Sequence, residues 1–313
     1  MALRNRFRPL SGFGNLPRLI GGLLIAVLLS GAAAADGLQS AIMAFHAGSY
    51  DDARTTLEPL ASAGDARAQY WLGRLYDGGH GVPEDAGKAY TLFRQAAEQG
   101  HAEAQRVVGV YYEEGKVVGQ SFVDAARWYE KAAEQGNDKA QRNFGTALLL
   151  GRGAPASARR AAEYFQKSAD QGNPKAMRNL AYLYYFGSGL RPDRERAAVL
   201  FQKAAASGVG KADYDLARLH YRGHGVAQDF DLARQLFAKA AKGGHGKAQL
   251  FLGRMHLRGE GGPKDNKQAY YWLSLAATQE PKDAELLLNR ARDRLNDSDI
   301  EEMDAKVAAF QSR

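Results

Sequence analysis

The chain of 313 residues contains no cysteine. Disulfide bonds, thiolate metal sites and lipid attachment through cysteine are therefore excluded, and the fold must be stabilised by packing alone. The motifs G-x-S-x-G, S-x-x-K and H-E-x-x-H are also absent, so the common arrangements for nucleophilic or zinc-dependent hydrolysis are missing. Neighbouring acids such as Asp51 and Asp52 point to different faces of a helix or lie in turns, as solvated charges do. We therefore expect no enzymatic activity.

Acidic residues are absent from residues 1–35, which carry four arginines, an apolar run over 19–29 and small residues near the end. This order of segments is typical of a secretory signal peptide and predicts cleavage between Ala35 and Asp36. We therefore expect a periplasmic or secreted protein. The alternative is an uncleaved anchor in the inner membrane with a periplasmic domain, because residues 19–35 reach the lower end of the ~17–25 residues that span a bilayer. Alanine and glycine in the second half of that run favour cleavage.

The chain has little excess of either charge once this segment is removed. Subtracting the four signal arginines from 42 Lys+Arg leaves 38, against 35 Asp+Glu. Such a balance does not support a basic field directed at nucleic acid. Gly87 and Lys88 imitate a nucleotide-binding loop, but Ala89 stands where a metal-binding hydroxyl is needed, and Gly81 lies one residue too far away. We expect no nucleic acid, nucleotide or other cofactor.

One glycine-rich motif recurs every 36 residues, first as G-H-G-V-P-E-D and later as G-H-G-V-A-Q-D and G-S-G-L-R-P-D. The residue that closes it has a short side-chain oxygen, which can accept a hydrogen bond from the first turn of a helix. The predicted helix caps are Asp85, Ser121, Ser157, Asp193, Asp229 and Asp265.

An amphipathic helix is predicted after each cap, because alanines and an aromatic residue or leucine follow at spacings of four. In the first copy these residues are Ala89, Phe93 and Ala97, and Gly100 ends the helix in a left-handed conformation. Another helix precedes the glycine motif over about 66–77. Small residues at two of its positions predict close approach of the two helix backbones.

These patterns predict an all-α fold, an α-solenoid of antiparallel helix pairs. Residues 36–65 form an N-terminal capping helix pair, 66–280 hold six full repeats, and 281–313 form C-terminal capping helices. Two turns depart from the pattern, since Lys116–Val118 replaces the glycines in one and Leu148 replaces tyrosine before the other. We expect those two turns to be shaped differently.

The pattern of Ala68, Leu72, Gly73 and Tyr76, followed by the glycine motif, resembles the Sel1-like repeat, a 36-residue relative of the tetratricopeptide repeat. The resemblance implies an α-solenoid that acts as a protein-interaction scaffold, often periplasmic in bacteria. Some cysteine-rich members of that family carry a β-lactamase label. Because this chain has none of their cysteine pairs, a cell-wall or β-lactam hydrolase is only a weak alternative.

Histidines suggest a metal site, but six of the seven occupy equivalent positions of different repeats rather than converging on one point. We therefore expect a structural role and no metal. His220 and His256, on neighbouring first helices, are the one pair to examine.

The first helix of each unit lines the concave surface in related solenoids. Arginine and tyrosine dominate the outward positions of this helix. Because these residue types contribute strongly to interfaces, they predict a binding surface. The alternative interpretation is that the arginines merely solvate the helix face. Phe186 and Arg222 share these positions. The predicted groove residues are Tyr70, Arg74, Arg106, Arg142, Arg178, Tyr182, Tyr185, Tyr214, Arg218, Tyr221, Arg254 and Arg258.

The sequence therefore predicts an exported scaffold or regulatory adaptor that binds an acidic or extended protein partner of the cell envelope in this groove. The alternative is a binder of anionic exopolysaccharide or peptidoglycan, because the same side chains suit both ligands.

Overall fold

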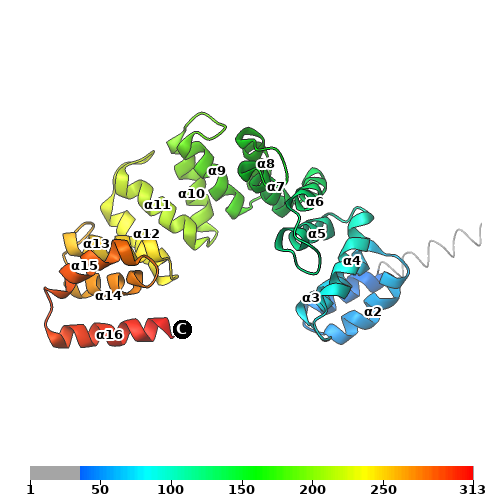
Figure 1. Ribbon diagram of the computed structural model, residues 1–313, viewed down its shortest axis with the longest axis horizontal. Coiled ribbons are helices and arrows are strands. Elements are labelled where there is room, and N and C mark those ends of the chain that lie inside the picture. Colours follow the sequence, from blue (N-terminus) through cyan, green and yellow to red (C-terminus); the bar gives the residue numbers. More distant parts are fainter. Residues whose placement is uncertain (1–35, 313) are drawn as a thin grey trace, which may run out of the picture. The chain divides into compact units, whose positions relative to one another are not determined.

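The computed structural model describes residues 36–312, which form two compact units that meet at Ala104 and Gln105. Every regular element in this part of the chain is a helix, so the predicted all-α fold is confirmed. The first unit contains helical residues 36–46, followed by three antiparallel helices (Figure 1). They are α2 (Tyr50–Ser62), α3 (Ala66–Gly78) and α4 (Ala86–Glu98).

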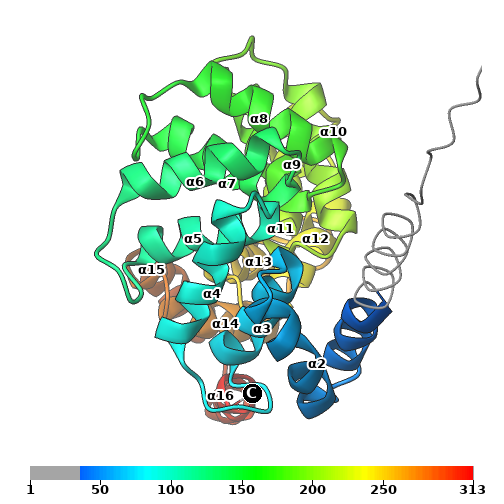
Figure 2. The ribbon, with the colours of Figure 1, turned by 90° about the vertical axis from the view of Figure 1, so that its right-hand side faces the viewer.

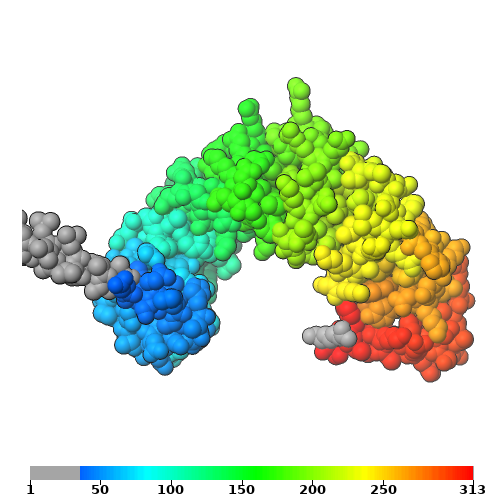
Figure 3. Space-filling view, turned by 180° about the vertical axis from the view of Figure 1, so that it is seen from behind, coloured from blue at the N-terminus to red at the C-terminus, as the bar shows by residue number. Residues whose placement is uncertain are grey.

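The second unit continues the same alternation of helices, and each helix from α6 to α14 packs against the next (Figures 1 and 2). At its C-terminal end α16 packs against α14, as the red and orange atoms of Figure 3 show. The division between the units falls inside α5. The helices are α5 (Ala102–Glu114), α6 (Phe122–Glu134), α7 (Asp138–Leu150), α8 (Ala158–Asp170), α9 (Pro174–Phe186), α10 (Arg194–Ala206), α11 (Gly210–Arg222), α12 (Phe230–Lys242), α13 (Gly246–Arg258), α14 (Asn266–Ala277), α15 (Pro281–Arg292) and α16 (Asp297–Gln311).

None of the described helices is both long enough and apolar enough to cross a bilayer. The predicted signal peptide, including Ala35 at the predicted cleavage site, lies outside the described residues.

The predicted helix caps are confirmed in all six copies. Each side-chain oxygen accepts a hydrogen bond from the backbone N–H three residues later, at 2.9 Å for Asp85 and 3.3 Å for Ser157. The same bond forms at the other four predicted caps. A cap of this kind stabilises a helix by about 1 kcal/mol, so the repeat fixes the start of every second helix locally.

The glycine turns bring consecutive repeats together. Gly225 has a φ of +75°, and a Cβ built there would lie 2.2 Å from the carbonyl oxygen of Arg194 at the start of α10. Only glycine allows both this conformation and this approach.

The two turns that depart from the glycine pattern keep the same shape, so the expectation that they differ is wrong. Val117 takes the place of a glycine with a φ of 69°, and the turn of the next repeat has left-handed Gly151 and Gly153. A β-branched residue at positive φ is a strained exception. The turn therefore keeps its left-handed geometry even where the sequence does not favour it.

The core follows the predicted periodicity. Phe165, the aromatic residue of α8, is fully buried. A Cβ on Gly145 of α7 would lie 2.8 Å from the Phe165 ring, and Gly73 stands in the same relation to Phe93. The helical glycines therefore allow close packing of the two helices, as the sequence predicted.

Buried glutamines join the helices of the first three repeats, which the sequence analysis did not anticipate. In the third repeat, Gln141 Nε2 donates to the Ala133 carbonyl at 3.2 Å, and Gln171 Nε2 donates to Gln141 Oε1 at 2.8 Å. These bonds satisfy polar groups that the packing removes from water.

Candidate functional site

Two of the predicted groove residues, Tyr70 and Tyr214, are buried, so their predicted outward position is wrong. Their rings stack on His101 and His245, the residues just before the first helix of the following repeat, with ring centroids 4.7 Å and 4.4 Å apart. Each histidine also caps a helix, and His245 Nδ1 accepts from the Ala248 N–H at 3.3 Å. The tyrosines are thus covered by the histidine at the end of their own repeat, a contact that the periodicity of one helix does not reveal.

Several predicted arginines lie against aromatic rings of their own helix. The guanidinium of Arg74 lies 5.1 Å from the Trp71 ring centroid, and that of Arg254 lies 4.3 Å from the Phe251 ring centroid. Their planar faces are therefore partly covered. Arg106 and Arg142 are also half-buried, and burial lowers the pKa of Arg142.

At the C-terminal ends of the first helices, the predicted residues bind the turn of the next repeat. The Tyr185 hydroxyl is 2.8 Å from His224 Nδ1, and the Tyr221 hydroxyl donates to Glu260 at 2.9 Å. Arg258 also approaches Glu260, at 3.5 Å. These three side chains therefore contribute to the scaffold itself.

Arg178 and Tyr182 of α9 share one buried carboxylate, that of Asp215 on α11. Arg178 Nε lies 2.6 Å from Asp215 Oδ2, and the Tyr182 hydroxyl donates to the other oxygen. The Asp215 side chain is only 2% exposed, and burial raises the pKa of this carboxyl despite both partners. Asp215 was not among the predicted site residues. The sequence does mark it, because Asp215 is an acid at a position where the other repeats carry Trp71, Val107, two asparagines or Phe251.

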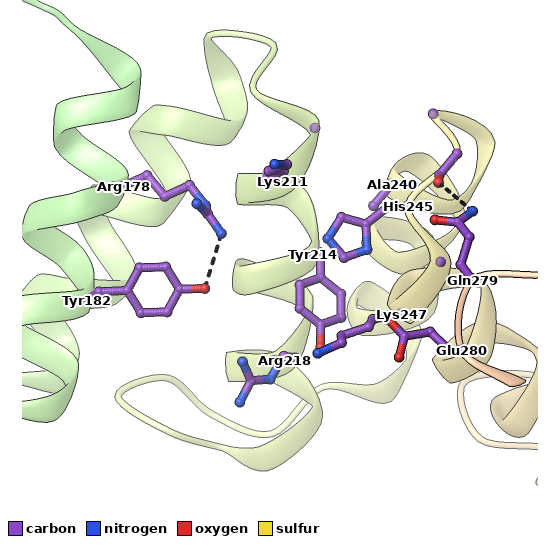
Figure 4. Close-up of a pocket in the computed structure, with 14 residues that line it drawn as sticks. Arg178, Tyr182, Lys211, Tyr214, Arg218, Ala240, His245, Lys247, Gln279 and Glu280 are labelled. Carbon is purple, nitrogen blue, oxygen red and sulfur yellow. Dashed lines mark hydrogen bonds between the residues drawn. The ribbon is translucent and has the colours of Figure 1, made fainter. Parts of the chain in front are cut away.

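A pocket of about 730 Å³ opens beside this network, between α9, α11, the start of α13 and the turn before α15 (Figure 4). We call it the basic pocket. It includes four of the predicted groove residues, two of which are arginines. Its side-chain walls are Arg178, Tyr182, Lys211, Tyr214, Arg218, His245, Lys247, Gln279 and Glu280.

Charge in the basic pocket is unbalanced. Arg178 is neutralised by Asp215, but no ion pair or hydrogen bond in the described structure engages the charged groups of Lys211, Arg218 or Lys247. One carboxylate, Glu280, lies on the wall. Three cations around a hollow surface with a single acid produce a positive potential, which attracts anionic ligands.

Part of the wall opposite α9 is backbone, because Gly243, Gly244 and Gly246 line it. In the first three repeats the position of Gly243 holds a glutamine that reaches back to its own first helix, such as Gln171. The absence of that side chain leaves backbone at the edge of the hollow. This explains in part why the pocket lies here rather than at every repeat.

His245 forms part of the pocket wall and is neutral. Its Nδ1 accepts the helix-capping bond, so the proton of the neutral ring resides on Nε2. Burial, together with the charges of Arg178 and Lys211, lowers the pKa of His245. The ring therefore offers a neutral N–H donor beside the cations.

The histidine pair singled out in the sequence does not form a shared site. His256 is held by Arg234, whose Nη2 lies 2.7 Å from His256 Nδ1, whereas His220 Nδ1 is buried with no hydrogen-bond partner. Within residues 36–312, no three histidine, aspartate or glutamate side chains are grouped as a metal would require.

The repeats match the family model described as the Sel1 repeat at residues 66–101, 102–137, 138–173, 174–209, 210–245 and 246–281. A search among curated proteins gave no match.

Two solved structures with the same repeat are similar over most of this chain. A protective antigen with an SLR fold, present in uropathogenic Escherichia coli strains, has 30% identity and a TM-score of 0.77. That similarity covers 82% of this chain but only 56% of the antigen. A Sel1 repeat protein from Oxalobacter formigenes has 31% identity and a TM-score of 0.72 over 78% of this chain and 98% of its own. The chain therefore belongs to the Sel1 repeat family.

Proposed function

We propose that the protein is an exported, periplasmic adaptor whose basic pocket captures an acidic segment of a partner protein. Sel1 repeat solenoids generally serve as scaffolds for protein interaction, which supports this class of function. The observation that carries the proposal is the group of three cations around one hollow, Lys211, Arg218 and Lys247, none of which forms an ion pair in the described structure. Complementary charge speeds the encounter with an anionic segment and selects it over neutral ones.

Reversing the charge of the pocket is expected to abolish this capture. The variant K211E/R218E/K247E should bind a fluorescein-labelled polyglutamate peptide about 100-fold more weakly, because exposed charges contribute up to about 1 kcal/mol each. Fluorescence anisotropy at low ionic strength measures the affinity.

A matched control keeps the net charge change and moves it away from the pocket. Lys139 and Lys175 occupy the position of Lys211 and Lys247 on earlier first helices, and Arg159 on α8 is 82% exposed. The variant K139E/R159E/K175E should retain most of the binding. Equal losses of affinity in both variants would mean that binding depends on the net charge of the protein and not on the pocket. Unchanged binding in the pocket variant would contradict the proposal. Selective retention of an anionic polysaccharide without any protein partner would replace it.

Export is tested independently of binding. We expect protein recovered from the periplasm to begin at Asp36, because the small residues before it suit signal peptidase. Intact mass spectrometry measures the N-terminus. A chain that retains residues 1–35 in the membrane fraction would support the anchored alternative, and retention in the cytoplasm would refute export.

A further inference from the structure

Phe186 is the most exposed large apolar side chain among residues 36–312, with 64% of its surface accessible. It ends α9, and the equivalent positions of the other repeats hold Gly78, Glu114, Leu150 and two arginines. The scaffold therefore does not require a phenylalanine here. An exposed aromatic ring that the fold does not use is a candidate contact for a partner.

Phe186 is joined to the basic pocket through Tyr182. The two rings are parallel within 4°, with centroids 6.1 Å apart, and Tyr185 contacts Phe186 edge-on at 4.8 Å. Tyr182 also lines the pocket (Figure 4). An aromatic surface thus continues from the pocket wall to the end of α9.

The three α9 residues Arg178, Tyr182 and Phe186 are spaced by four, so they form one stripe along the helix. Eight residues of helix correspond to about 12 Å. An extended peptide advances roughly 3.3 Å per residue, so about three or four residues cover this distance. One short segment can therefore span from Arg178 on the wall of the basic pocket to the Phe186 ring.

We infer that the partner segment is bipartite: acidic side chains enter the basic pocket, and an apolar side chain three or four residues away packs on Phe186. This inference rests on the proposed function, because it assigns the cations to the same acidic segment. A protein segment fits better than a glycan, since the exposed Phe186 ring adds an apolar contact beside the charges. The apolar contact supplies the specificity that charge alone does not provide.

Peptide display on the purified protein, followed by anisotropy with single synthetic peptides, tests the inference. We expect selected peptides to combine acids with Leu, Ile, Phe or Trp three or four residues away. Phe186→Ala should weaken such a peptide about tenfold and leave polyglutamate binding unchanged. Leu150→Ala is the matched control, because Leu150 occupies the same position one repeat earlier, is 54% exposed and does not line the pocket.

The outcomes separate this inference from the proposed function. Selection of acids without a spaced apolar residue, or equal losses in Phe186→Ala and Leu150→Ala, would overturn the bipartite segment while the acidic pocket stands. Selection of apolar peptides without acids would overturn both. A thermal melt of each variant identifies any loss caused by unfolding, and Phe186→Leu should restore binding if the ring acts as an apolar contact.

Discussion

Replacing Asp215 with alanine is expected to destabilise the repeats around α9 and α11 by about 3 kcal/mol. The change removes the carboxylate that receives both Arg178 and Tyr182, and it leaves the guanidinium at a site where its side chain is only 24% exposed. An unpaired charge held away from water is costly, and partial access to solvent places the effect at the lower end of the usual range. Denaturant unfolding followed by circular dichroism measures the loss.

Two companion variants decide the cause. R178M/D215L replaces both charges with apolar groups and should be less destabilising than Asp215→Ala alone, because no charge is left without a partner. Glu163→Ala removes an acid that is 59% exposed on α8 and should change stability by well under 1 kcal/mol. If Asp215→Ala matched the Glu163→Ala control, the buried network would not contribute to stability.

The same network affects how binding experiments are designed. Arg178 is a predicted groove residue and lines the pocket, but its charge is already used by Asp215. Replacing it with glutamate would place two carboxylates together in a poorly hydrated site, and lost binding would then report lost folding. Lys211 and Lys247 have no such partner and are exposed, so they give a cleaner test of the pocket.

The fold could be predicted from the sequence because its rules are local. The cap at Asp85, the alanine stripe of α4 and the left-handed glycine at 100 each depend on residues within one helix turn. Because the pattern recurs every 36 residues, the same local rules predict the helices of the other repeats. Val117 shows the limit, since a β-branched residue gives no local reason to expect the positive φ that it adopts.

Only part of the candidate site could be predicted, because the sequence pattern describes one helix at a time. Tyr182 and Arg218 were found because arginine and tyrosine dominate the outward positions of the first helices, but Tyr214 is covered by His245 at the end of its repeat. Lys211 and Lys247 were missed because a lysine at the same position also occurs in earlier repeats, so the repeat pattern does not set these two apart. Contacts with residues outside a helix decide which of its side chains are buried, and a single-helix pattern contains no information about those contacts.

Acidification is expected to destabilise α13 and α14 by about 3 kcal/mol between pH 6.5 and pH 4, through His256. Burial and the charge of Arg234, which donates to His256 Nδ1, lower the pKa of His256 to about 4, whereas Asp265 opposes the shift weakly. The unfolded chain therefore takes up the proton first as the pH falls. The full contribution of neutral His256 to the free energy of unfolding is present above pH 6.5. As the pH falls, this contribution decreases by about 1.4 kcal/mol per pH unit until His256 is also protonated in the folded state.

Hydrogen exchange of the α13 and α14 amides measures this loss locally, which matters because solenoid repeats can unfold in parts. His256→Gln replaces Nδ1 with an amide oxygen that can accept from Arg234 but does not titrate, so the exchange of this variant should depend less on pH than that of the natural protein. His101 and His245 also have lowered pKa values, so both proteins share a background dependence on pH. The difference between the two proteins isolates His256. If the two proteins gave parallel pH profiles, the prediction would be wrong, and the turn between α13 and α14 would tolerate a charged His256 ring. Arg234 would then have to move away on acidification, because a proton on Nδ1 cannot coexist with the 2.7 Å contact to a guanidinium.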